Sequence, residues 1–204
     1  MTEQEWLMCA EPKPMLEFLQ GKASDRKLRL FAIACCRYDW GRLIVTCRNT
    51  VEVAERFADG KASAEELAQA KQAAWVIWTH ERIVGSSLRQ TQSVVLAADE
   101  ALSSKILTLG ESYMRVEWPI LSDMIGDLFG NPFRQVVIDP AWRTPTVTSL
   151  AQAFYDDRDF TRMPILGDAL EDAGCSSSEI LEHCRLPEEH GRGCWVVDLV
   201  VDKN

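Results

Sequence analysis

Residues 25–36 decide the fold, and they read Asp25-Arg26-Lys27-Leu28-Arg29-Leu30-Phe31-Ala32-Ile33-Ala34-Cys35-Cys36. The apolar residues recur at the i, i+3, i+4, i+7 spacing of one helix face, as Leu28, Phe31, Ala32 and Cys35. Leu30, Ile33 and Ala34 widen that face. Such a broad apolar surface indicates a helix that is buried on more than one side.

The same spacing continues along most of the chain in both directions. Ser63-Ala64-Glu65-Glu66 predicts a capping box, in which the serine oxygen and the second glutamate each satisfy a free backbone amide. Ser176-Ser177-Ser178-Glu179 repeats that pattern. Helical stretches are expected over residues 2–7, 12–19, 24–36, 51–58, 63–84, 88–109, 112–129 (with a kink or restart at Pro119), 146–155, 165–173 and 176–184. We therefore predict a mainly α fold, a multi-helix bundle.

Two segments depart from helical spacing. Residues 135–138, Gln-Val-Val-Ile, are the best candidate for a short strand or an extended segment, and Asp139-Pro140 ends it. Residues 194–201 are rich in β-branched side chains, which favours a second strand, although 135–138 is its one obvious partner. The sequence thus allows at most a small β element.

The clearest interruption in the chain is Gly130-Asn131-Pro132. It predicts a helical region over residues 1–130 and a mostly helical C-terminal region over residues 131–204. A chain of 204 residues is a comfortable length for one compact domain, so we expect the second region to pack on the first.

The composition is that of an acidic globular protein. The formal net charge is −9, and hydrophobic residues make up 47% of the chain. The start, Met1-Thr2-Glu3-Gln4-Glu5-Trp6, is acidic and resembles no export signal, and no window approaches the length of a membrane span. Seven cysteines in such a chain are typical of reduced thiols, so we expect a cytoplasmic protein.

A basic segment stands out against this acidic background. Seven basic and two acidic residues lie between Lys22 and Arg48. Arg26, Lys27, Arg29 and Arg37 predict a docking surface for an acidic protein or for a second copy of this chain. The alternative is a helix face that pairs with acidic neighbours within the fold. Nucleic acid is a further possibility for this segment, disfavoured by the net charge.

The C-terminal part concentrates potential metal ligands. Cys175, His183, Cys184, His190 and Cys194 lie within twenty residues of one another. Zinc requires four nitrogen or sulfur ligands in a tetrahedron, and the loop from Arg185 to Gly193 could fold His190 and Cys194 back toward Cys184. Adjacent positions of a helix point about 100° apart, so at most one of His183 and Cys184 is expected to join. The predicted zinc ligands are Cys175, Cys184, His190 and Cys194. The alternative is a set of buried structural thiols with surface or capping histidines.

Other candidate sites are weaker. Cys35-Cys36 lies on the apolar stripe and is predicted to be core rather than nucleophilic. His80 falls late in a helix, where histidine is more often a surface residue than a base. Asp156, Asp157 and Asp159 lack the glycine and glutamate of a calcium loop. The chain has no phosphate-binding loop, dinucleotide fingerprint or nucleophile elbow.

Several short sequence motifs carry a resemblance that covers nearly the whole chain. They are 25–31, Cys35-Cys36-Arg37, Asn131-Pro132-Phe133-Arg134, Asp139-Pro140-Ala141-Trp142, 165–175 and 193–199. In these the chain resembles a large paralogous family of uncharacterised proteins abundant in planctomycete genomes. The resemblance implies a cytoplasmic bacterial protein and assigns no activity or site. The sequence therefore predicts a non-enzymatic interaction module, with zinc stabilisation and nucleic-acid binding as alternatives.

Overall fold

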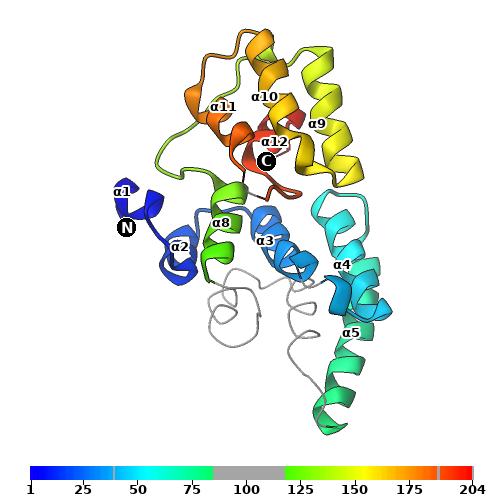
Figure 1. Cartoon of the computed structure of the whole chain (residues 1–204). Coiled ribbons are helices and arrows are strands. Elements are labelled where there is room, and N and C mark those ends of the chain that lie inside the picture. The colour runs from blue at the N-terminus through cyan, green and yellow to red at the C-terminus, as the bar shows by residue number, and fades with distance from the viewer. Residues whose placement is uncertain (39, 85–117, 188, 204) are drawn as a thin grey trace. The chain divides into compact units, whose positions relative to one another are not determined.

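The computed structural model describes residues 1–38, 40–84, 118–187 and 189–203, and it is built from helices (Figure 1). Within those ranges the backbone forms no β-strand, which confirms the predicted mainly α fold. None of the helices described is both long and apolar enough to cross a membrane. The predicted helix at 88–109 lies outside the described residues.

The chain divides into two compact units, Met1–Ser122 (unit 1) and Asp123–Asn204 (unit 2). The division falls inside helix α8, Trp118–Phe129, whereas the sequence places it after Gly130. Pro119 occupies the first turn of α8, where the missing N–H of proline costs nothing. Residues 123–130 therefore group with the C-terminal region. That the C-terminal region packs on the first stays a prediction.

Unit 1 contains α1 (Glu3–Leu7), α2 (Pro12–Leu19), α3 (Asp25–Tyr38), the 3-10 turn η1 (Trp40–Arg42), α4 (Val45–Ala58) and α5 (Ala64–Val84). Helix α3 packs on α4, and α4 packs on α5. Ser63 and Glu66 form the predicted capping box, since Glu66 N–H donates to Ser63 Oγ (3.2 Å) and Ser63 N–H donates to Glu66 Oε2 (2.9 Å). Helix α4 starts at Val45, before the predicted Val51.

Unit 2 contains the second half of α8, η2 (Pro140–Trp142), α9 (Pro145–Asp157), η3 (Phe160–Arg162), α10 (Met163–Asp172), α11 (Ser178–Arg185) and α12 (Trp195–Val201). Helix α10 packs on α9 and α11, and α12 packs on α9 and α11. Their apolar faces enclose one core that includes Phe154, Tyr155, Leu166, Leu170 and Val197. The core therefore joins all four C-terminal helices.

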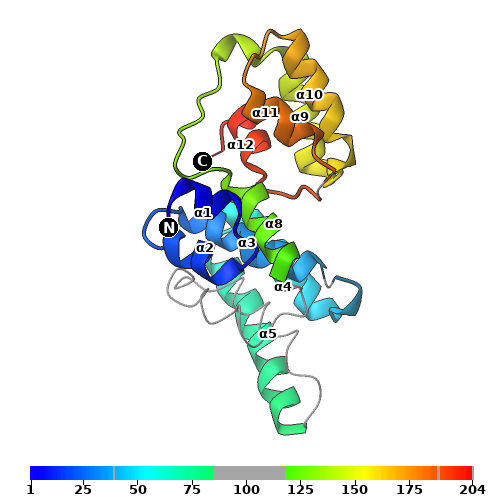
Figure 2. The same cartoon turned by 60° about the vertical axis from the view of Figure 1, so that its left-hand side comes forward.

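Neither candidate segment forms a strand. Residues 135–138 run as an extended connection without strand pairing, visible between α8 and α9 in Figure 2. Residues 195–201 form helix α12, with Val196, Val197 and Val200 buried on one face. With no partner strand among the described residues, the β-branched side chains of α12 gain more from burial on α9 and α11, and burial overrides local β propensity.

Candidate metal centre

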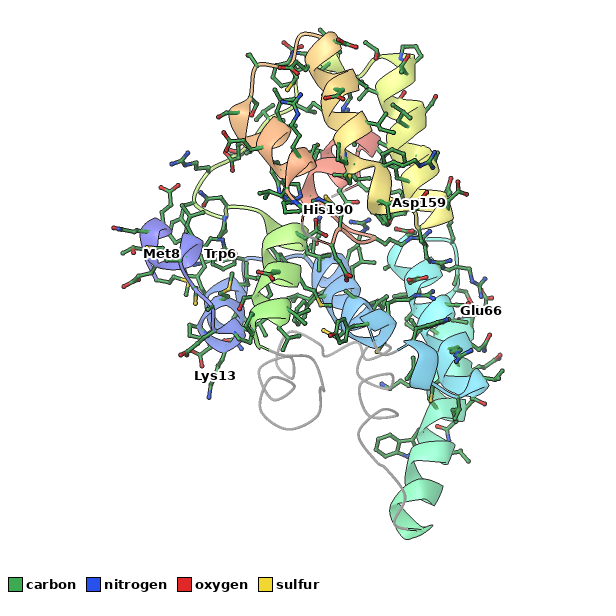
Figure 3. The ribbon with its side chains drawn as sticks, in the orientation of Figure 1. Trp6, Met8, Lys13, Glu66, Asp159 and His190 are labelled. Atoms are coloured by element: carbon green, nitrogen blue, oxygen red, sulfur yellow. The ribbon has the colours of Figure 1, made fainter. Side chains whose placement is uncertain are left out.

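Four side chains of unit 2 direct potential metal ligands at one point. Asp127, His183, His190 and Cys194 each offer one ligand atom, and these four atoms all lie within 4.8 Å of one another. Asp127 belongs to α8, His183 to α11, His190 to the α11–α12 loop, and Cys194 is the N-cap of α12. In Figure 3 the labelled His190 lies between the end of α8 and helices α11 and α12.

The backbone around the donors fixes their positions. Ser177 caps α11 by accepting a hydrogen bond from Ile180 N–H (3.4 Å), so the predicted capping box at Ser176 is replaced by a single cap one residue later. Beyond α11, Cys194 N–H donates to Gly191 C=O (2.9 Å) and closes a turn that places His190 beside Cys194. The turn therefore brings the potential ligand atoms of His190 and Cys194 close to His183 on α11.

Asp127 ties this loop to α8. Gly191 N–H donates to Asp127 Oδ2 (2.9 Å), while Asp127 Oδ1 lies 2.7 Å from His190 Nδ1 and 3.2 Å from His183 Nε2. One carboxylate oxygen is thus held by the backbone, and the other faces both rings. The carboxylate presents a single oxygen to the centre of the cluster.

The distances approach those of a tetrahedron around a zinc ion. With ordinary zinc–ligand bonds, neighbouring donor atoms are roughly 3.3 to 3.6 Å apart. His183 Nε2 lies 3.2 Å from Asp127 Oδ1 and 3.2 Å from Cys194 Sγ. The His190 Nδ1 distances, 2.7 Å to Asp127 Oδ1 and 4.0 Å to Cys194 Sγ, fall on either side of that range. These two contacts each differ from that range by about half an ångström, and all four ligand atoms lie within 4.8 Å of one another.

The contacts of the cluster fit two kinds of interaction. Each of the two ring nitrogens faces both the Asp127 carboxylate and the Cys194 sulfur. A ring nitrogen carries either one proton or one lone pair in the ring plane, so in a hydrogen-bonded network it can satisfy only one of these neighbours. A cation at the centre would instead accept a lone pair from all four atoms at once. The geometry is therefore compatible with a hydrogen-bonded network and with a bound metal.

The same contacts argue against a nucleophilic cysteine. In a Cys-His-Asp relay the thiol and the carboxylate bind opposite nitrogens of the imidazole, so that a proton can pass between them. Here Asp127 and Cys194 approach the same nitrogen of His183, Nε2. Cys194 is also completely buried.

Burial and charge set the protonation of the donors. Burial works to raise the pKa of Asp127, but the contacts with His183 and His190 outweigh it and lower that pKa to about 2. Burial first, and the Asp127 carboxylate second, raise the pKa of the Cys194 thiol well above its usual value. A metal would therefore have to displace the thiol proton, as zinc does when it binds cysteine.

The structure brings together two of the four predicted ligands. His190 and Cys194 meet in the cluster, joined by His183, which the sequence also marks as a candidate. Cys175 and Cys184 instead lie in the core of unit 2, and burial raises the pKa of Cys184 to about 12. His183 and Cys184 do point apart, as expected, but the histidine is the residue that joins. Its position three residues after the buried Ile180 was an available signal.

Asp127 is the potential ligand that sequence reasoning missed. It lies more than fifty residues before the other donors and follows no spacing that marks a ligand. It is 4% exposed, although most aspartates are at the surface. Only the approach of α8 to the α11–α12 loop identifies it.

The predicted basic surface is largely occupied within unit 1. Arg37 binds the buried Glu55 through two hydrogen bonds, 2.9 and 2.7 Å long. Arg26 pairs with Asp59 at 3.3 Å, and the buried Arg29 lies over the Phe57 ring. Lys27 is half-buried on the same helix. These contacts match the alternative of a helix face paired with acidic neighbours.

The remaining candidates take structural positions. Cys35 and Cys36 are buried in α3, and burial raises the pKa of Cys35. Asp157 ends α9, and Asp159 caps η3 by accepting a hydrogen bond from Thr161 N–H (3.3 Å). The side chain of His80 lies outside the described residues.

Comparison of the chain with protein-family models, with curated proteins and with solved structures finds no match. The resemblance to the planctomycete family therefore stays a prediction, and the case for function rests on the site itself.

Proposed function

We propose that unit 2 is a zinc-stabilised helical module and that Asp127, His183, His190 and Cys194 hold the ion. The convergence of their four ligand atoms within 4.8 Å of one another carries this proposal. Two imidazoles, one thiolate and one carboxylate form the nitrogen, sulfur and oxygen donor set that suits zinc. Calcium and magnesium require six or more oxygen ligands, which this cluster does not supply.

The charges of the donors also suit a divalent ion. Asp127 and the deprotonated Cys194 contribute two negative charges, and the two histidines bind as neutral rings. A zinc ion would make the buried cluster neutral as a whole, which avoids the large cost of an uncompensated charge in the interior. This balance supports zinc over a monovalent ion.

The proposed role is structural. Catalytic zinc sites keep one coordination position for water or substrate, whereas structural sites use four protein ligands. The donors here come from α8, α11, the loop and α12, so the ion would link α8 and the α11–α12 loop to two helices of the unit 2 core. When bound, zinc would supply binding energy to folding.

Zinc stabilisation has more support than the two other predicted functions. Docking of an acidic protein or of nucleic acid requires available positive charge on residues 22–48, yet Arg26, Arg29 and Arg37 are engaged inside unit 1. A non-enzymatic interaction role stays compatible with a zinc-stabilised module, and its partner surface is then to be sought elsewhere.

Metal analysis of untagged, purified protein tests the proposal. We expect one zinc ion per chain, and we expect a strong chelator to lower the free energy of unfolding by about 3 kcal/mol or more, as for a ligand held at a hundred times its Kd. Less than stoichiometric zinc, removable without any change in unfolding, would contradict the proposal.

Two cysteine substitutions discriminate the observed cluster from the ligands predicted by sequence. Cys194→Ala should abolish stoichiometric zinc, whereas Cys184→Ala should retain it, because Cys184 packs in the core and only Cys194 reaches the cluster. Both residues are fully buried cysteines of unit 2, so the pair is matched for burial. Loss of zinc from the Cys184 variant alone would favour the other ligand set.

A further inference from the structure

The side chains of all four donor residues are nearly enclosed, and that of His183 is the most exposed of them. The side chains of Asp127 and His190 are 4% and 3% exposed, and Cys194 has no exposed surface. The His183 side chain is 10% exposed.

The Trp195 indole packs beside the His183 ring. The two rings lie 5.1 Å apart, centroid to centroid, and are tilted by 48°. Trp195 is itself half-buried and packs against the core of unit 2. Trp195 also directly follows Cys194 in the chain, so a shift of the Trp195 backbone also moves the Cys194 sulfur.

Gly130 forms the other wall of the indole site. A Cβ atom at Gly130 would lie 3.1 Å from Trp195 Cγ and 3.2 Å from Cδ1 and Cδ2, too close for any side chain without displacement of the ring. Gly130 also has a φ of +59°, which favours glycine. The indole is thus confined between the end of α8, which carries Asp127, and the His183 ring.

We propose that Trp195, confined between Gly130 and His183, is the positioning residue that sets the rate at which the metal leaves the cluster. It binds no metal, and it acts by holding the His183 ring in place and by keeping water and chelators away from that ligand. This inference rests on the proposed zinc site. Removal of the indole should open the cluster at its least buried ligand while leaving all four donors in the chain.

The test is the rate of zinc transfer from the loaded full-length protein to a chromophoric chelator. We expect Trp195→Ala to release zinc at least tenfold faster than the original protein, and Trp195→Phe to fall between them. Trp142→Ala is the matched control, because Trp142 also packs on the unit 2 core but makes no ring contact with a donor among the described residues. Its release rate should be unchanged.

Cobalt absorption separates loss of the cover from loss of the ligands. Cobalt-loaded Trp195→Phe should keep the tetrahedral spectrum of the original protein, because its four donors are intact. Equal release rates in the original and both Trp195 variants would overturn the inference, as would equal acceleration by Trp142→Ala. If Trp195→Ala does not fold, the zinc release rate of Trp195→Phe is compared with that of the original protein, and equal rates would overturn the inference. Failure of the original protein to bind zinc at all would instead refute the proposed function.

Discussion

At the scale of single residues, Asp127 organises the candidate metal centre. One of its oxygens fixes the α11–α12 loop through Gly191, and the other faces His183 and His190. A buried, ionised carboxylate is costly unless it is paired and hydrogen-bonded, and these contacts supply that compensation. Asp127 therefore stabilises unit 2 even before a metal binds.

This stabilisation should depend on pH in the chelated, metal-free protein. The pKa of Asp127 is lowered from an ordinary 3.8 to about 2 in the folded state, so the unfolded chain takes up the proton first as the pH falls. The contribution is complete above about pH 5 and declines by about 1 kcal/mol at pH 3 and about 2 kcal/mol at pH 2.

Asp127→Asn provides the reference for this measurement, because an amide does not titrate. The difference in the free energy of unfolding between the original protein and this variant should shrink by those amounts as the pH is lowered from 6, as followed by urea unfolding with chelator present. Parallel pH profiles for the two proteins would show that the Asp127 contacts are not formed in solution.

At the scale of secondary-structure elements, the approach of α10 to α11 depends on one glycine. A Cβ atom at Gly167 would lie 3.0 Å from Cys184 Cβ. The Cβ position of Cys184 follows from its backbone and cannot rotate away, so a larger residue at 167 requires the two helices to separate. The close packing also sets the orientation of α11, which carries His183.

We therefore expect Gly167→Ala to destabilise unit 2 by about 1 to 3 kcal/mol, the usual cost of overpacking, despite the better helix propensity of alanine. Gly126→Ala is the matched control, since Gly126 is also helical and a Cβ there meets nothing within 4 Å. That substitution should stabilise the protein by up to about 1 kcal/mol. Urea unfolding measures the free energy of unfolding of both variants. Equal changes in Gly167→Ala and Gly126→Ala would refute the close approach of α10 and α11.

At the scale of the whole molecule, the boundary between the two units decides which residues the candidate site needs. Unit 2 begins at Asp123, so Asp127 and Gly130 belong with the donors of the C-terminal helices. A boundary after residue 130, as the sequence suggests, would separate Asp127 and Gly130 from the other three donors and from Trp195.

Two fragments test this boundary. We expect residues 118–204, which keep all of α8, to fold with one zinc ion. Residues 131–204 lack Asp127 and should bind zinc at least about 100-fold more weakly. Even the loss of a group that only orients a ligand lowers metal affinity by about 10- to 100-fold. Isothermal titration and circular dichroism measure both properties. Equal zinc affinity in the two fragments would exclude Asp127 as a ligand.

The sequence by itself determined the helical character of this protein, because the spacing of apolar residues and the caps at Thr2 and Ser63 are local signals that each helix carries within itself. It also marked His190 and Cys194, which lie four residues apart on one loop. Only the tertiary structure decided that 195–201 is a helix, that Cys184 is core and His183 a donor, and that Asp127 completes the cluster. Each of these depends on which distant segment packs alongside, and neither local propensity nor spacing records such contacts.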